Sequence, residues 1–240
     1  MSNRSDGLSA TLTINGRTWT RPIKSPLATL ASVLRAWGWR SVKVGCEAGD
    51  CGSCTVLLDG EAVCSCLVPV AQAEGASVLV ANGDDPVLAK LHAAFAGFGA
   101  AQCGACSPGM VMAAAALLNK TPSPTHADVE TAIGGVLCRC TGYAKIIEAV
   151  LAASRGDAAP SLPPLSAGVG APVARADGIV AARGELEFGD DVFIHDGIHL
   201  RIVRSPHARA RFRLGDLDAF ARAHRLEHVF TARDVPGRNA

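Results

Sequence analysis

The sequence has little charge and no long apolar run, and each of these absences excludes a class of protein. Charged residues make up 19% of the 240 residues and the formal net charge is +1, which argues against a nucleic-acid binder. The longest purely apolar run, Met110 to Leu118, is too short to cross a bilayer. Residues Met1 to Thr13 lack the basic-then-apolar layout of a secretory signal and contain no twin-arginine pair. We therefore expect a cytoplasmic protein with no membrane span and no nucleic-acid partner.

The familiar motifs of hydrolases and nucleotide-binding enzymes are also missing. The sequence shows no Ser-His-Asp layout, no glycine-rich phosphate loop and no HExxH, and its seven histidines form no metal-ligand cluster. Gly97-Phe98-Gly99 is an isolated short pair of glycines and carries no weight as a nucleotide motif. We therefore expect no catalytic residue in this chain.

Cysteine is the residue that stands out, because nine are present and eight of them fall into two groups of four. Thiolates are the ligands that soft, redox-active iron clusters require, and four of them close one [2Fe–2S] cluster. A secreted, disulfide-stapled protein would need an oxidising compartment and is usually much shorter. The two groups therefore predict two [2Fe–2S] clusters. Two such clusters on one chain suggest that it transfers electrons one at a time.

The first group opens with the C-x4-C-x2-C run of Cys46, Cys51 and Cys54, the spacing of plant-type [2Fe–2S] ferredoxins. Glycines within this run allow tight turns around a small anionic object, and free N–H groups there can stabilise the reduced cluster. Cys64 and Cys66 follow in a segment where strand alternation would place both side chains on one face. The spacing alone leaves the fourth ligand open between these two cysteines.

The second group combines a C-x2-C pair, Cys103 and Cys106, with a later C-x-C pair, Cys138 and Cys140. Each pair directly precedes an expected helix, where the positive end of the helix dipole favours the thiolate. Two helix N-termini converging on one cluster would offset the cost of burying negative charge. A four-cysteine zinc site is the alternative, but zinc usually takes C-x2-C on both sides, so the C-x-C pair favours iron.

The first third of the chain has the pattern of a small mixed sheet with one crossing helix. The expected strands are short, alternate in polarity or adjoin turn residues, and cover residues 8–14, 17–23, 55–58, 61–63 and 77–80. Asn15-Gly16 and Asp59-Gly60 supply hairpin turns, since these residues tolerate positive φ. Ser25-Pro26 resembles an N-cap and first helical residue, which predicts a helix running through Trp37.

The next segment changes to helical periodicity. Four expected helices each carry an N-terminal signal, at Asp85-Pro86, Ser107-Pro108, the Thr125–Asp128 capping box and Thr141-Gly142. Four helices of modest length indicate a compact bundle.

The remainder of the chain is expected to be a linker followed by a second β-rich region. Residues 156–170 are rich in Pro, Gly, Ala and Ser, the composition of a linker. Beyond them, Arg209, Arg211 and Arg213 alternate with apolar residues and would line one face of a strand. Without aromatic interleaving, this face is expected to be solvated or to meet a protein partner rather than nucleic acid.

Three strings, CEAGDCGSCTVLLDG from Cys46, QCGACSPGM from Gln102 and CRCTGY from Cys138, are similar to the signature of the xanthine dehydrogenase and aldehyde oxidoreductase family, the molybdenum hydroxylases. The resemblance implies an α+β fold, with a β-grasp [2Fe–2S] ferredoxin domain over residues 1–83 and a four-helix [2Fe–2S]-binding domain over residues 84–156. It also implies that Cys66 is the fourth ligand of the first group. The implied metal ligands are all cysteines: Cys46, Cys51, Cys54 and Cys66 for one cluster, and Cys103, Cys106, Cys138 and Cys140 for the other.

The end of the chain resembles the same family less closely, on RSPHA at residues 204–208 and TARDVPG at residues 231–237. These strings look like the opening of the large molybdenum subunit. The resemblance implies a linker over residues 157–174 and part of a hammerhead-type α/β domain over residues 175–240. The chain is then expected to be a fragment or a naturally split subunit whose partner completes the fold.

The resemblance implies an electron-transfer subunit of an enzyme that oxidises aldehydes or N-heterocycles. Gln102 and Cys140 match positions that approach the pterin of the molybdenum cofactor, held at the interface with a large molybdenum-binding subunit. Electrons would leave the molybdopterin centre through the second group's cluster and then the first group's cluster, toward a subunit carrying FAD or an external acceptor. The chain would not be catalytic alone.

Two other functions remain open from the residues. A free-standing ferredoxin-like carrier or an iron–sulfur redox sensor would also need the clusters, but it would have no use for the hammerhead-like tail. A zinc-bound interaction module would use the cysteines without electron transfer.

Overall fold

The structure is a computed structural model that describes residues 7–157, 168, 173–192 and 194–237. The chain divides into two compact units, the first ending at Val192 and the second beginning at Phe193. Each unit is described by itself below. None of the helices in the described ranges has the length and apolar character needed to span a membrane.

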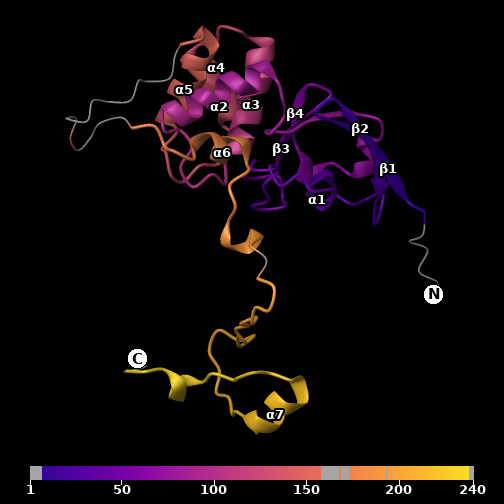
Figure 1. Cartoon of the computed structure of the whole chain (residues 1–240), viewed down its shortest axis with the longest axis vertical. Helices are drawn as coiled ribbons and strands as arrows, with labels where there is room; N and C mark the ends of the chain where they lie inside the picture. The colour runs from indigo at the N-terminus through magenta and orange to yellow at the C-terminus, as the bar shows by residue number, and fades with distance from the viewer. Residues whose placement is uncertain (1–6, 158–167, 169–172, 193, 238–240) are drawn as a thin grey trace. The chain divides into compact units, whose positions relative to one another are not determined.

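A five-stranded mixed sheet forms the first part of the first unit (Figure 1). Its strands are short and run β1 Ser9–Ile14, β2 Arg17–Pro22, β3 Thr55–Leu58, β4 Glu61–Cys64 and β5 Ser77–Leu79. Their spatial order is β2-β1-β5-β3-β4, with β1 and β5 parallel and the other neighbours antiparallel. Helix α1, Leu30–Ala36, packs Leu30 and Leu34 into the same core as Leu12 and Val56. The predicted mixed sheet with one crossing helix is confirmed.

The predicted start of α1 at Pro26 is wrong, because the helix begins only at Leu30. Ser25 does act as a cap, but its hydroxyl accepts from the Leu27 amide and closes a single turn. Thr29 is then held extended by a bridge to Pro69, and Leu30 N–H donates to the Val68 carbonyl at 2.7 Å. Thr29 then caps the helix by accepting from the Ser32 amide. A long-range pairing with the segment before residue 70 therefore outweighs the local N-cap signal.

Four helices follow the sheet, as predicted, and they enclose a second core. They are α2 Pro86–Gly97, α3 Ser107–Lys120, α4 His126–Ile133 and α5 Ala144–Arg155. Asp85 caps α2 through the Val87 and Leu88 amides, and Thr125 and Asp128 form the predicted capping box of α4. Short 3₁₀ turns complete the unit at Ser65–Leu67, Val70–Ala73 and Gly189–Asp191.

Residues 173–192, called here the return segment, follow the predicted linker and pack against the rest of the first unit. The predicted linker, residues 157–174, falls almost entirely outside the described residues. Helix α6, Gly178–Arg183, contacts α2 and α3, and Ala181 and Ala182 are fully buried (Figure 1). Gly178 allows this approach, because a Cβ there would lie 2.9 Å from Ala96.

The second unit contains helix α7, Leu217–His224, and a 3₁₀ turn at Ala232–Asp234. The prediction of a β-rich region is wrong for the part of this unit that is described, since residues 194–237 contain no strand. The alternating segment 209–213 is exposed at every residue. A strand without a neighbour leaves its N–H and C=O groups unpaired, so alternation alone does not produce one.

Candidate iron–sulfur sites

The first three cysteines of the first group lie on an irregular loop that leads into β3. Glu47, Gly49 and Gly52 all have positive φ, at 54°, 82° and 67°, and they turn the chain back on itself. Two backbone amides then converge on Cys46: its Sγ accepts from Ala48 N at 3.3 Å and from Cys51 N at 3.4 Å. These hydrogen bonds lower the pKa of Cys46 to about 7. The loop therefore favours a thiolate, the form that binds iron.

Two thiols near Cys54, those of Cys64 and Cys66, are candidates for the fourth ligand of this group. The expectation that they share a strand face is wrong, because β4 ends at Cys64 and Cys66 belongs to a 3₁₀ turn. Cys66 is 6% exposed, and burial with the nearby Cys54 thiol raises its pKa to about 11. Cys64 is half-buried, and its thiol donates to the Gly49 carbonyl at 3.7 Å. Cys64 thus already has a protein partner, while the assignment of Cys66 as ligand stays a prediction.

The second group is brought together at the N-terminal ends of α3 and α5. Cys106 lies close to Cys138 and Cys103 lies close to Cys140, and all four thiols are near enough to interact electrostatically. Cys106 directly precedes α3, as the sequence predicts, while Cys138 and Cys140 precede α5 by a short turn.

The electrostatics of this second group differ from one thiol to the next. Burial, reinforced by the neighbouring Cys138 thiol, raises the pKa of Cys106 to about 12. Burial would also raise the pKa of Cys138, but hydrogen bonds from Thr141 lower it overall. The Thr141 hydroxyl lies 3.2 Å from Cys138 Sγ and accepts from the Tyr143 amide at 3.1 Å, which leaves its proton free for the sulfur.

The described residues contain no group of three or more Cys, His, Asp or Glu side chains arranged to hold a single metal ion. A mononuclear zinc site would need its ligands around one point. A [2Fe–2S] cluster instead has two irons, and four thiolates share them. The choice between a [2Fe–2S] cluster and zinc at this group rests on the cysteine spacing and not on this arrangement.

The two residues predicted to approach a pterin lie on the accessible side of the second group. Gln102 and Cys140 are exposed, whereas Cys106 is buried. Their role toward a cofactor stays a prediction, although their exposure is what such a contact needs.

The two cysteine loops touch each other directly, which the sequence analysis did not predict. The Leu137 amide donates to the Cys51 carbonyl at 2.9 Å, and Leu137 immediately precedes Cys138. A Cβ on Gly52 would lie 2.2 Å from the Gly135 carbonyl oxygen, and one on Gly109 would lie 2.6 Å from the Gly52 carbonyl oxygen. These glycines were the available signal, because only glycine permits backbones this close.

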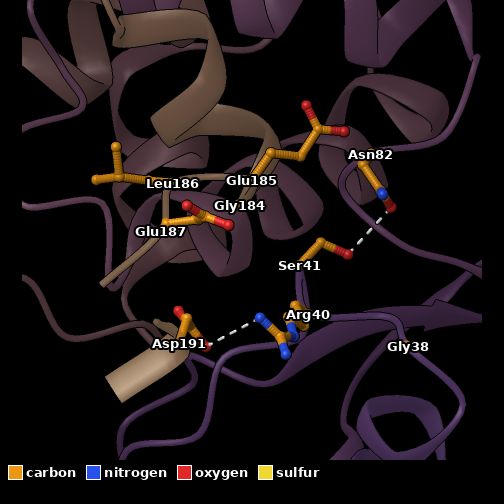
Figure 2. Close-up of a pocket in the computed structure, with 9 residues that line it drawn as sticks. All are labelled: Gly38, Arg40, Ser41, Asn82, Gly184, Glu185, Leu186, Glu187 and Asp191. Carbon is orange, nitrogen blue, oxygen red and sulfur yellow. Dashed lines mark hydrogen bonds and ion pairs between the residues drawn. The ribbon is translucent and has the colours of Figure 1, made fainter. Parts of the chain in front are cut away.

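The return segment covers the second group's first loop. A Cβ on Gly104, between Cys103 and Cys106, would lie 3.2 Å from Leu186 and 3.5 Å from Ala181. A cavity of about 210 Å³ lies between this segment and the sheet domain, where Gly38, Arg40, Ser41 and Asn82 line it (Figure 2). An Arg40–Asp191 ion pair at 3.7 Å lies at its edge. No cysteine lines the cavity, so it is separate from both thiol groups.

Comparisons with known proteins agree with this geometry. The family model described as "2Fe-2S iron-sulfur cluster binding domain" matches residues 12–89, and the one described as "[2Fe-2S] binding domain" matches residues 79–151. The first range covers the first cysteine group and the second covers the other.

Two relatives and one solved structure extend the comparison. The chain is 45% identical over 149 residues to the nicotine 6-hydroxylase small subunit of Paenarthrobacter nicotinovorans, covering 61% of this chain and 90% of that protein. It is 40% identical over 153 residues to the xanthine dehydrogenase iron-sulfur-binding subunit of Escherichia coli O157:H7, covering 62% of this chain and 96% of that protein. The crystal structure of the aldehyde oxidoreductase from Desulfovibrio desulfuricans matches with a TM-score of 0.70 at 36% identity, over 76% of this chain and 22% of that one.

Proposed function

The chain belongs to the molybdenum hydroxylases, the xanthine dehydrogenase and aldehyde oxidoreductase family, as an iron–sulfur subunit, and on this premise we propose how its residues carry an electron. It is an electron-transfer subunit of an oxidoreductase, with two [2Fe–2S] domains. The sites of the individual clusters and the route between them are the proposals that follow.

Each cysteine group holds one [2Fe–2S] cluster. The proposed ligands are Cys46, Cys51, Cys54 and Cys66 for the first cluster and Cys103, Cys106, Cys138 and Cys140 for the second. When bound, a [2Fe–2S] cluster supplies one-electron oxidation and reduction at potentials set by hydrogen bonding, charge and exposure. The amides that converge on Cys46 and the Thr141 hydroxyl at Cys138 supply such hydrogen bonds.

The observation that carries the proposal is the contact between the two loops. The Cys51 carbonyl accepts from Leu137, the residue before Cys138, at 2.9 Å. A ligand of the first cluster is thereby joined to a ligand of the second by one hydrogen bond and a short stretch of backbone. Gly52 and Gly109 allow this close approach, since a Cβ on either would collide with the facing backbone.

We propose that the electron enters this chain at Cys140 and leaves it from the first cysteine group. Cys140 and Gln102 are exposed at the rim of the second group, where a large molybdenum-binding subunit would present its molybdopterin. Cys46 is exposed on the first group, where a subunit carrying FAD or an external acceptor would take the electron. The relatives' names, a small subunit and an iron-sulfur-binding subunit, support a larger assembly.

The test is electron paramagnetic resonance of the full chain purified with its iron and sulfide. We expect two distinguishable signals after reduction, with Cys106→Ser removing one and Cys54→Ser removing the other. Loss of both signals in each variant, or zinc in place of iron and sulfide, would contradict the assignment. Purification of the native complex separates an enzyme subunit, which brings a molybdenum subunit with it, from a free-standing carrier, which does not.

A further inference from the structure

Ser107 carries a buried hydroxyl that has no hydrogen-bond partner among the described residues. The residue is 1% exposed, follows Cys106 directly and is the first residue of α3. Buried side-chain hydroxyls in folded proteins are nearly always paired, because they lose their bonds to water on folding. An unpaired one beside a cluster ligand therefore calls for a partner that the polypeptide does not supply.

The neighbours of Ser107 close it off from solvent on two sides. A Cβ on Gly184 would lie 2.8 Å from Pro108, so the return segment packs against the residue after Ser107. A Cβ on Gly109 would lie 2.6 Å from the Gly52 carbonyl oxygen, so the first cysteine loop packs against the residue after that. The start of α3 is thus held between the return segment and the other cysteine group.

Two other hydroxyls beside cysteines show that the lack of a partner is specific to Ser107. Ser65, also fully buried and next to Cys66, donates to the Cys54 carbonyl at 2.6 Å. Thr141 lies 3.2 Å from Cys138 Sγ. In each case the protein provides the partner, whereas Ser107, next to the proposed cluster ligand Cys106, has none among the described residues.

We propose that the Ser107 hydroxyl donates a hydrogen bond to an inorganic sulfide of the second cluster, since no cysteine sulfur accepts it. A hydrogen bond to sulfur is stronger when the cluster has gained an electron and is more negative, so it raises the reduction potential. Ser107 is then a residue that tunes the second cluster and leaves the first unaffected. The inference rests on the proposed function, since it requires a cluster on the second cysteine group.

The experiment compares Ser107→Val with Ser107→Thr in the full chain. Threonine keeps the hydroxyl and valine has the same shape without it, so any strain from the added methyl group is shared by both variants. Potentiometric titration of the two electron paramagnetic resonance signals measures each cluster separately. Exchangeable deuterons coupled to the second cluster are measured in the same samples.

We expect Ser107→Val to make reduction of the second cluster about tenfold less favourable than Ser107→Thr, which is about 59 mV for a one-electron couple. The valine variant should also lose one exchangeable deuteron that the threonine variant retains. Ser65→Ala is the matched control: it removes a buried hydroxyl next to a cysteine of the other group and should leave the second cluster's potential unchanged.

Equal potentials and equal deuteron couplings in the two variants would overturn the inference, because the hydroxyl would then bond elsewhere. That outcome leaves the proposed function intact, since both clusters are still observed. Absence of the second signal from the unmodified chain is a different result and would overturn the proposed function itself.

Discussion

The two cysteine groups each have to stabilise four thiolates around a cluster, and they do so in different ways. The first is wrapped by a loop with positive φ at Gly49 and Gly52, and backbone amides converge on the exposed Cys46. The second lies at two helix N-terminal ends, keeps Cys106 buried, and adds the Thr141 hydroxyl to the backbone donors at Cys138. Backbone donors are independent of side-chain identity, whereas hydroxyl donors can be changed by a single substitution. The second group is therefore the one whose properties sequence variation can tune most readily.

The largest expected effect separates Cys66 from Cys64 in the first group. Cys66→Ser should abolish the first cluster's signal and leave the second, because a buried thiolate ligand is lost. Cys64→Ser should retain both signals, because the Cys64 thiol is already bonded to the Gly49 carbonyl. Iron content and electron paramagnetic resonance of both variants check this. Loss of the first cluster's signal in Cys64→Ser but not in Cys66→Ser would show that Cys64, and not Cys66, is the fourth ligand.

The contact between the two groups is tested by Gly52→Ala. Gly52 has φ of 67° and a Cβ there would lie 2.2 Å from the Gly135 carbonyl, so the loops must separate. We expect a loss of about 3 kcal/mol or more in the free energy of unfolding, the range for strained, overpacked positions.

Gly60→Ala is the matched control for that change. Gly60 has φ of 87° with nothing within 4 Å of a Cβ, so it carries the backbone strain without the collision. Its cost should stay at about 1–2 kcal/mol in chemical denaturation, the penalty of a left-handed backbone alone. Equal losses for the two variants would show that the loops are not held together by this contact.

A smaller effect is expected where the return segment covers the second group. Gly178→Ala places a Cβ 2.9 Å from Ala96, whereas Gly189→Ala meets nothing within 4 Å. Alanine favours a helix over glycine by about 1 kcal/mol, so only a steric clash would make Gly178→Ala destabilising. Hydrogen exchange of the α6 amides should accelerate in Gly178→Ala and not in Gly189→Ala. Unchanged α6 exchange in both would mean that the segment is not fixed by this packing.

The smallest effect is a difference in reactivity between the groups in the metal-free chain. Backbone hydrogen bonds from Ala48 and Cys51 lower the pKa of Cys46 to about 7, so its thiolate fraction rises as the pH rises through 7. Burial raises the pKa of Cys106 to about 12, so that thiol stays protonated over the same range. Alkylation of Cys46 followed by mass spectrometry should therefore reach half its maximal rate near pH 7. A half-maximal alkylation rate near pH 9 would contradict the lowered pKa of Cys46.

Local signals predicted much of the first unit. The Asn15-Gly16 and Asp59-Gly60 turns lie where expected, and the Thr125–Asp128 capping box forms. The start of α1 was missed, because pairing of Leu30 with Val68 is a long-range contact that no local cap reveals.

The cysteine spacing predicted both thiol groups but not their contact. The Leu137–Cys51 hydrogen bond joins residues far apart in the sequence, and only the glycines at 52 and 109 hinted at it. The strand expected at residues 209–213 did not form, because periodicity records which side chains could face a partner and not whether a partner strand is present. Ser107 looked like an ordinary helix start, and only its burial without a partner marks it.

The most direct test of the account is the magnetic interaction between the two reduced clusters in the full chain. With the loops joined at Cys51 and Leu137, we predict two one-electron [2Fe–2S] signals that split each other when both clusters are reduced. Two signals that never interact, or a single signal with half the expected iron, would contradict the claim that this chain passes an electron from one cysteine group to the other.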